Sequence, residues 1–186
     1  MYYHCSPVSG LTWLQPRKPQ HFEKDALVYM TTSLPMALMY GIRNFEYTYG
    51  YTKDGQIYYE EYFPDSLRIL YEGKSASLYE CAPQVVNTTP IPNEVVSPLP
   101  VKVVREVRIP DVMLSLLAQE QCGALVIRRY EALSPRMRAW IMDAEKNEIK
   151  KRALLRTPSP MAEYMKLHYP SAWAAALAED KQTPED

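Results

Sequence analysis

The chain has 186 residues, enough for one domain with a sizeable buried core. Its 47% apolar and 23% charged residues are ordinary for a globular protein, and 21 basic against 22 acidic residues give a net charge of −1. This balance excludes any strong overall attraction to nucleic acid or to anionic membranes.

The first strand is predicted at residues 1–6, almost at the N-terminus. Prolines and a glycine within residues 7–26 predict a loop, which Leu11, Trp13 and Leu14 attach to the core. Because no basic lead precedes an apolar run at the N-terminus, we expect no signal peptide.

A strand that feeds a short helix is predicted next. Residues 27–30 form the strand, and the Thr-Thr-Ser run at 31–33 offers N-cap hydroxyls for a helix. Pro35 suits the first helical turn, because its missing N–H would have no partner there. This unit places Tyr29 at the end of the strand and Tyr40 in the helix.

The middle of the chain is predicted to be mainly β. Residues 44–55 are rich in tyrosine and end in a Lys-Asp-Gly turn signal, and residues 85–93 are predicted to be a proline-punctuated loop. Residues 66–71 fit either a strand or a short helix. Further strands are predicted at 57–63, 77–81, 94–97 and 101–109, the last from its period-two alternation.

From Pro110 onward the pattern is mainly helical. Gly123 is predicted to stop a first helix, and Ser134 with Pro135 to start a long one. The apolar stripe of the long helix is predicted to comprise Met137, Trp140, Ile141, Ala144 and Glu148. Helices are predicted at 111–121, 135–152, 160–167 and 171–179, with a last strand at 124–130 and a frayed tail from 180.

These elements predict an α+β fold, with six to eight strands and helices at the C-terminal side. We assign residues 1–109 to a β-rich core, and residues 110–186 to a C-terminal strand and helices packed on that core. The whole is expected to be a single compact domain.

The three cysteines, Cys5, Cys81 and Cys122, are an odd set without metal-ligand spacing. We therefore expect no disulfide framework, no metal site and a reduced, cytoplasmic location. No apolar run approaches the roughly 18 residues of a membrane span. With only six glycines, the chain contains no glycine-rich phosphate loop.

Three fragments stand out through their order in the chain. They are Tyr3–Ser6 on the first strand, Val28–Tyr29 eleven positions before Tyr40, and Asn93–Val96 after the proline loop. In this order they resemble the His–Tyr–Glu triad of the ADP-ribosyltransferase superfamily, on the poly(ADP-ribose) polymerase and diphtheria-toxin side. The resemblance spans roughly residues 2–109. The chain also resembles small bacterial members of this superfamily whose substrate is undefined.

The resemblance implies an ADP-ribosyltransferase-like split β-sheet core that binds NAD as a substrate, without a metal. It makes Glu94 the catalytic carboxylate. This group would stabilise the oxocarbenium-like charge that develops as the nicotinamide–ribose bond breaks. It makes Tyr29 and Tyr40 the aromatic faces that hold the flat, cationic nicotinamide ring.

By the same resemblance, His4 hydrogen-bonds the adenosine-side ribose, and Ser6 the nicotinamide carboxamide beside the backbone of Cys5. The chain departs from the family at Cys5, where glycine is usual. A Cβ and a sulfur there either narrow the nicotinamide cleft or leave it usable, because the backbone amide and carbonyl remain. A redox-sensitive gate at Cys5 is a further option.

Two main functions are therefore weighed. The first is an enzyme that transfers ADP-ribose to an unknown protein or small-molecule acceptor, or hydrolyses NAD. The alternative is a catalytically inactive interaction module of the same fold, which Cys5 favours. A third option, transfer chemistry on RNA or DNA ends, is disfavoured by the near-neutral charge.

Other charged residues are alternative candidates for a functional role. Glu60, Glu61 and Glu80 also lie on or next to predicted strands, but Asn93-Glu94 matches the family's motif and its place in the chain. The basic residues between positions 146 and 156 are predicted to form the solvated face of a helix, balanced by Glu145 and Glu148.

Overall fold

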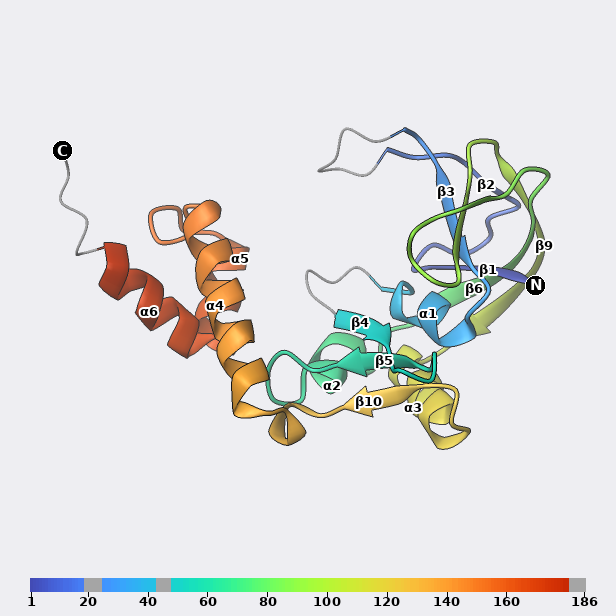
Figure 1. The fold of residues 1–186 in the computed structure, drawn as a ribbon. Helices are drawn as coiled ribbons and strands as arrows, with labels where there is room; N and C mark the ends of the chain where they lie inside the picture. The colour runs from blue at the N-terminus through green and yellow to red at the C-terminus, as the bar shows by residue number, and fades with distance from the viewer. Residues whose placement is uncertain (19–24, 43–47, 181–186) are drawn as a thin grey trace. The chain divides into compact units, whose positions relative to one another are not determined.

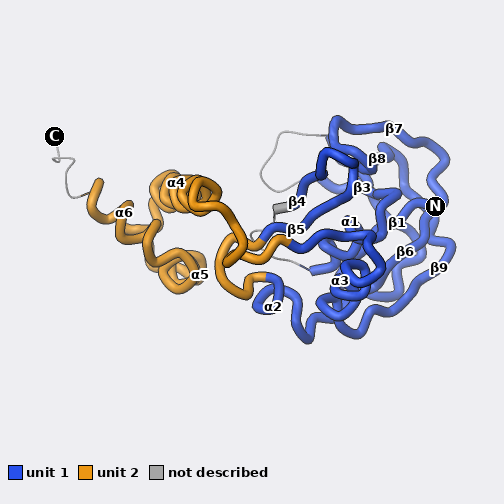
Figure 2. Tube along the Cα trace, turned by 60° about the horizontal axis from the view of Figure 1, so that its bottom comes forward, with its two compact units in different colours: residues 1–60, 67–127 blue, residues 61–66, 128–186 orange. Residues whose placement is uncertain are grey.

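The computed structural model describes residues 1–18, 25–42 and 48–180, which form a mixed α+β protein with two compact units (Figures 1 and 2). Unit 1 comprises residues 1–60 and 67–127, and unit 2 comprises residues 61–66 and 128–186. The predicted boundary at 109 thus differs from this division, which keeps α3 (Val112–Gln121) with the sheet of unit 1. The predicted packing of both parts into a single domain stays a prediction.

Unit 1 is built on a seven-stranded antiparallel sheet with the order β2-β9-β6-β1-β3-β8-β7. Its strands are β1 (Tyr2–Ser6), β2 (Trp13–Leu14), β3 (Val28–Thr31), β6 (Ala76–Ala82), β7 (Asn87–Thr88), β8 (Glu94–Ser97) and β9 (Val101–Ile109). A second sheet has the order β10-β5-β4. It contains β4 (Thr48–Tyr51), β5 (Ile57–Glu60) and β10 (Val126–Arg128).

The ten strands of the described residues exceed the six to eight predicted. The predicted loops 7–26 and 85–93 contain β2 and β7, which have only two residues each and are too short for a periodic pattern. The tyrosine-rich stretch contains β4, and the predicted strands 57–63 and 124–130 are shorter than expected. Residues 66–71 form a helix, α2 (Ser66–Tyr71).

The predicted helix starts are confirmed. Helix α1 (Leu34–Met39) is capped by Ser33, whose Oγ accepts the N–H of Met36 at 3.4 Å, and Pro35 lies in its first turn. The Asp111 side chain caps α3, and Gly123 follows it at φ +77°, a left-handed backbone that glycine adopts without strain.

Apolar side chains cover both faces of the large sheet. On one face, Cys5 and Leu78 pack with α1, α3 and residues of the second sheet, such as Tyr59. On the other face, Met30 and Tyr79 belong to a separate cluster that includes β2 and β8 residues. Leu14 is buried as predicted, whereas Trp13 is 48% exposed and does not anchor the loop in the core.

Unit 2 contains the three C-terminal helices α4 (Pro135–Lys151), α5 (Pro160–His168) and α6 (Pro170–Asp180), preceded by a short 3₁₀ helix, Tyr130–Ala132. The predicted stripe of α4 is partly wrong, since the buried residues are Ile141, Glu145 and Ile149, while Trp140 is 54% exposed. Residues 181–186 of the predicted frayed tail lie outside the described residues. Among the described helices, none is both long and apolar enough to cross a membrane.

The basic residues of α4 and its C-terminal end are balanced by carboxylates, among them Glu148, as predicted. Lys146 and Lys150 both bind Glu179 of α6, at 2.8 and 2.7 Å. Glu148 pairs with Lys151 and Arg152, and Glu145 is buried. The Glu179 contacts therefore tie α6 to α4.

Acid titration of Glu179 should loosen unit 2. Hydrogen bonds from Lys146 and Lys150 lower the pKa of Glu179 from its ordinary 4.5 to about 2. Because the folded-state pKa is the lower one, the stabilisation is complete above about pH 4.5 and is lost as the pH falls towards 2. We predict that Glu179→Gln lowers the melting temperature at pH 7, and that this difference from wild type disappears near pH 2.

The matched control is Glu163→Gln, which removes an exposed i,i+3 pair with Lys166 within a single helix. It should change the melting temperature little at either pH. Equal effects of the two substitutions at pH 7 would show that the α4–α6 tie has no special role.

Candidate functional site

A cavity lies where the central strands of the large sheet separate. Strands β1 and β3 are paired only at Tyr3 and Thr31. A continued antiparallel register would bring His4 opposite Met30 and Cys5 opposite Tyr29, but neither pair is formed. The cavity at this seam has a volume of about 350 Å³, within the range of about 300–1,000 Å³ that is usual for small-molecule sites.

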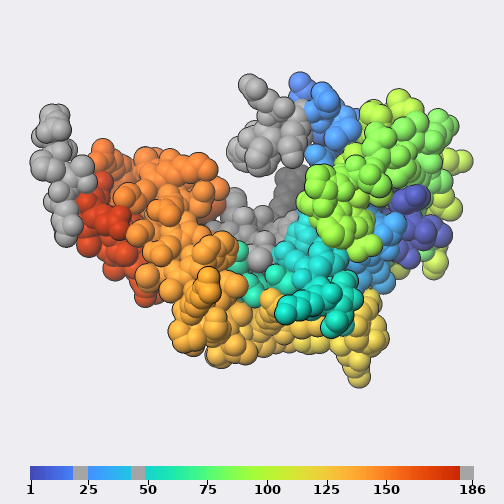
Figure 3. Space-filling view, viewed as in Figure 1, coloured from blue at the N-terminus to red at the C-terminus, as the bar shows by residue number. Residues whose placement is uncertain are grey.

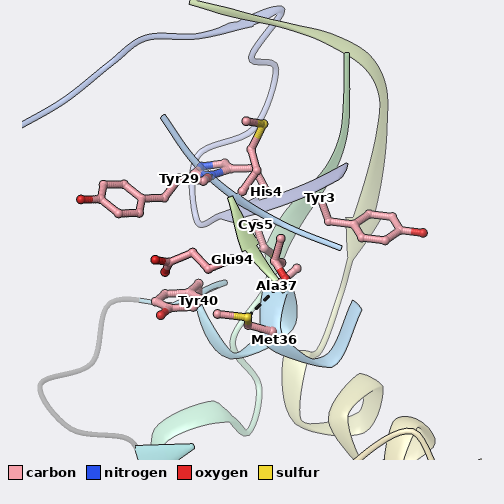
Figure 4. A pocket seen from close by; sticks show the side chains of 10 residues that line it. Tyr3, His4, Cys5, Tyr29, Met36, Ala37, Tyr40 and Glu94 are labelled. Atoms are coloured by element: carbon pink, nitrogen blue, oxygen red, sulfur yellow. Dashed lines mark hydrogen bonds between the residues drawn. The ribbon is translucent and has the colours of Figure 1, made fainter. Parts of the chain in front are cut away.

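Five of the six predicted site residues line this cavity, namely His4, Cys5, Tyr29, Tyr40 and Glu94 (Figure 4). They come from β1, β3, β8 and the C-terminal end of α1. In Figure 4 the Glu94 side chain lies between those of Tyr29 and Tyr40, and all three extend to the same side. The structure thus brings together residues that are up to 90 positions apart in the chain.

Ser6 is the exception. Side chains alternate along a strand, so Ser6 shares the face of His4 and not that of Cys5. It does not line the Glu94 cavity, and its Oγ accepts the N–H of Val8 at 3.1 Å. The structure therefore does not support the predicted contact between Ser6 and the carboxamide of a ring held beside Glu94.

Glu94 is positioned by the turn that precedes β8. Asn93 has φ 63°, in the left-handed region that asparagine tolerates better than most residues. Its carbonyl accepts the N–H of Thr32 at 3.0 Å, and its Oδ1 accepts the Thr32 hydroxyl at 3.1 Å. Glu94 then pairs with Thr31 across β3 and β8, which places its side chain on the face that carries Tyr29.

Tyr40 lies at the edge of the cavity and is not a core residue, since it is 38% exposed. Its hydroxyl lies 3.0 Å from that of Tyr49, and the two rings meet edge to face with centroids 6.1 Å apart. Burial raises the pKa of Tyr49, and the hydrogen bond with Tyr40 and the nearby charge of Glu94 act in the same direction. Tyr49 therefore remains a neutral phenol beside the carboxylate.

His4 spans the seam. Its Nδ1 lies 2.9 Å from the backbone carbonyl of Tyr29, and because a carbonyl can only accept, Nδ1 carries the proton. Burial lowers the pKa of His4 more than this bond raises it. A neutral ring protonated at Nδ1 leaves Nε2 as a hydrogen-bond acceptor.

The sulfur of Cys5 packs into the core beneath α1. Gly41 lies against it, because a Cβ added at Gly41 would be 2.8 Å from Cys5 Sγ. Burial leaves Cys5 4% exposed and raises the pKa of its thiol to about 12, so the thiolate that oxidation requires is scarce. These observations argue against the redox gate considered for Cys5.

A second cavity of about 410 Å³ shares His4 and Tyr29 with the first. It is lined by Ser6 and by residues of the β2 region, among them Trp13, Arg17 and Lys18. The two cationic residues and the exposed indole were not predicted to form a site. The path of the loop that carries these residues decides which side chains lie near them, and composition does not reveal that path.

The rival carboxylates lie elsewhere. Glu60 and Glu61 are each 3% exposed, and Glu61 accepts the N–H of Tyr130 within unit 2. Glu80 faces Arg105, 3.4 Å away. None of the three lines the cavity of Glu94. Within the described ranges, no group of three or more His, Cys, Asp or Glu side chains is arranged to hold a metal ion.

No family model, curated protein or solved structure matches this chain. The proposed function therefore rests on the residues of the cavity and on their geometry.

Filling the space beside Cys5 should destabilise the protein. The added Cβ of Gly41→Ala would also lie 3.0 Å from the backbone oxygen of Leu38, so its neighbours must move. We predict a loss of about 1–3 kcal/mol in the free energy of unfolding, measured by denaturant titration. In a Cys5→Ala background the same substitution should cost less, and equal costs in both backgrounds would contradict the contact.

His4 should make stability depend on pH. Because burial lowers its folded-state pKa below the ordinary 6.5, the unfolded chain binds the proton more tightly. The contribution is complete above pH 6.5 and is lost as the pH falls through the folded-state pKa. We predict that His4→Asn, which keeps a donor for the Tyr29 carbonyl but does not titrate, weakens the pH dependence of the melting temperature between pH 7 and 5. An unchanged pH dependence would place the titration elsewhere.

Proposed function

We propose that this protein is an ADP-ribosyltransferase-like enzyme that binds NAD and cleaves its nicotinamide–ribose bond. The ADP-ribose is transferred to an unknown protein or small-molecule acceptor, or to water. The observation that carries the proposal is the convergence of Glu94, Tyr29, Tyr40 and His4 on one cavity.

The chemistry needs a carboxylate near the ribose. As the C–N bond breaks, its electron pair leaves with neutral nicotinamide, and positive charge develops on the ribose carbon and ring oxygen. Glu94 stabilises this charge and orients the acceptor, whose oxygen or nitrogen forms the new bond and gives its proton to solvent. A fixed carboxylate in a partly enclosed cavity is more effective than one in water, because the local dielectric constant is lower.

Tyr29 and Tyr40 suit the nicotinamide ring. The ring is flat and cationic before cleavage, and aromatic faces attract such a ring by about 0.5–2 kcal/mol each. Because both phenols extend to the same side as the Glu94 carboxylate (Figure 4), a ring stacked on either of them would have its scissile bond near that carboxylate. The attraction is lost when the neutral product forms, which favours its release.

The shared wall of the two cavities suits the remainder of NAD. The Nε2 acceptor of His4 matches a ribose hydroxyl, and Arg17 and Lys18 offer cations for the diphosphate. Trp13 and the apolar residues beside it offer a surface for the adenine ring. The proposal is that one ligand extends past this shared wall from the first cavity into the second.

The alternative of an inactive interaction module gains no support from the cavity. An inactive module of this kind is expected to have its cleft filled by one of the chain's own loops, 85–93 or 44–55. No described residue of either loop lines the cavity, which keeps its volume of about 350 Å³. Cys5, the residue that favoured inactivity, directs its sulfur at Gly41.

The test removes one charge. We predict that Glu94→Gln lowers the rate of nicotinamide release from NAD by at least about 100-fold, because the developing ribose charge loses its counter-charge. The melting temperature and its rise with NAD should remain close to wild type, since the amide keeps the shape of the side chain. Nicotinamide is quantified by chromatography.

Glu80→Gln is the matched control, because it removes a strand carboxylate outside the cavity. It should retain the wild-type rate of release. A wild-type protein that releases no nicotinamide, or a Glu94→Gln variant as active as Glu80→Gln, would overturn the proposal.

A further inference from the structure

We propose that Thr89 is a positioning residue that holds the Glu94 carboxylate in its reactive orientation, an inference that rests on the proposed function. Thr89 lies in the loop between β7 and β8, five residues before Glu94. Its Oγ1 donates to Glu94 Oε1 at 2.9 Å. No feature of the sequence alone singled out this residue.

The hydroxyl of Thr89 has only one proton to donate. It lies 2.9 Å from the Glu94 carboxylate and 3.4 Å from the carbonyl of Ile91, so the charged and closer acceptor is favoured. The Ile91 N–H in turn donates to Thr89 Oγ1 at 3.1 Å. This turn orients the hydroxyl, because its acceptor side is already occupied.

The C-terminal end of this loop is held by Tyr51. The Tyr51 hydroxyl donates to the carbonyl of Pro92, and the side-chain amide of Asn93 donates to the Tyr51 oxygen at 3.4 Å. Figure 3 shows the surfaces of this loop (green) and of the β4–β5 hairpin (cyan) adjoining on one face of unit 1. The loop is therefore fixed before Ile91 by the hydrogen bonds of Thr89 and after Ile91 by those of Tyr51.

The consequence for Glu94 is an unequal use of its two oxygens. Oε1 is bound by Thr89, while Oε2 accepts no hydrogen bond from any described residue. Oε2 is therefore the oxygen available to a ribose hydroxyl or to the incoming acceptor. Fixing one oxygen removes rotational freedom that would otherwise be lost during the reaction.

Three substitutions separate this role from a simple turn role. Thr89→Ser keeps both the donor to Glu94 and the acceptor for the Ile91 N–H. Thr89→Asp keeps an acceptor for that N–H but has no proton to donate at neutral pH. Thr89→Val loses both. Positioning predicts that Asp and Val both fail. Because the Asp carboxylate also repels Glu94, the only decisive result for the Asp variant is a wild-type kcat, which would refute positioning.

The first readout is the steady-state kinetics of nicotinamide release from NAD. We expect Thr89→Val and Thr89→Asp to lower kcat by about 10- to 100-fold with little change in KM, and Thr89→Ser to stay near wild type. A wild-type kcat in the Val or Asp variant would overturn the inference, as would a loss confined to KM.

The second readout needs neither NAD nor activity. In protein labelled with ¹³C at glutamate side-chain carboxyls, the Glu94 resonance is assigned by its absence in Glu94→Gln. It should move in Thr89→Val and remain in place in Thr89→Ser. An unmoved resonance in Thr89→Val refutes the hydrogen bond even if the enzyme is active. A moved resonance in a protein that releases no nicotinamide refutes the catalytic role and the proposed function, but not the contact.

Discussion

The hydrogen bond from the His4 ring to the Tyr29 carbonyl is the interaction on which the site depends. A strand carbonyl that faces a neighbouring strand normally accepts one of its backbone N–H groups. Here β1 and β3 pair only at Tyr3 and Thr31, and the imidazole of His4 satisfies the carbonyl of Tyr29 instead. The sheet can therefore open at its centre without leaving that carbonyl unpaired. The opening is the cavity, and the same ring borders the second cavity.

The elements around this opening supply different components of the site. Strand β8 presents Glu94 at its first residue, and the left-handed Asn93 directs the chain into that strand. Tyr40 follows α1 as its C-cap residue, which places a phenol at the cavity that Tyr29 also lines. Gly41 follows immediately and leaves room for the Cys5 sulfur. A carboxylate and two phenols thus face one space through ordinary strand and helix geometry, and the His4 imidazole on the other face of the sheet closes the seam.

Much of this arrangement could be predicted from the sequence, because the signals are local. Ser33 and Pro35 mark the start of α1, and the alternation of residues 101–109 marks β9. A common site for His4, Tyr29 and Glu94 was predicted from the resemblance of their fragments to a known triad, and all three lie on predicted strands. What could not be predicted depends on loop paths and on pairing between strands. Thr89 reaches Glu94 only because its loop folds back.

The errors have the same origin. Strands of two residues, such as β2 and β7, are formed by their partners and have no pattern of their own. Ser6 was assigned to the nicotinamide side through a motif, but strand alternation turns it to the opposite face from Cys5. In α4 the predicted stripe shares Ile141 with the buried face, which continues at Glu145 and Ile149 instead of at Ala144 and Glu148.

The proposed function requires that one molecule of NAD occupies both cavities along the seam. Two-dimensional NMR of the labelled protein during a titration with NAD tests this requirement. We expect saturable shifts of backbone amides in β1, β3 and β8, together with residues around Arg17 in the second cavity. Shifts that are absent at millimolar NAD, or that are confined to unit 2, would contradict it.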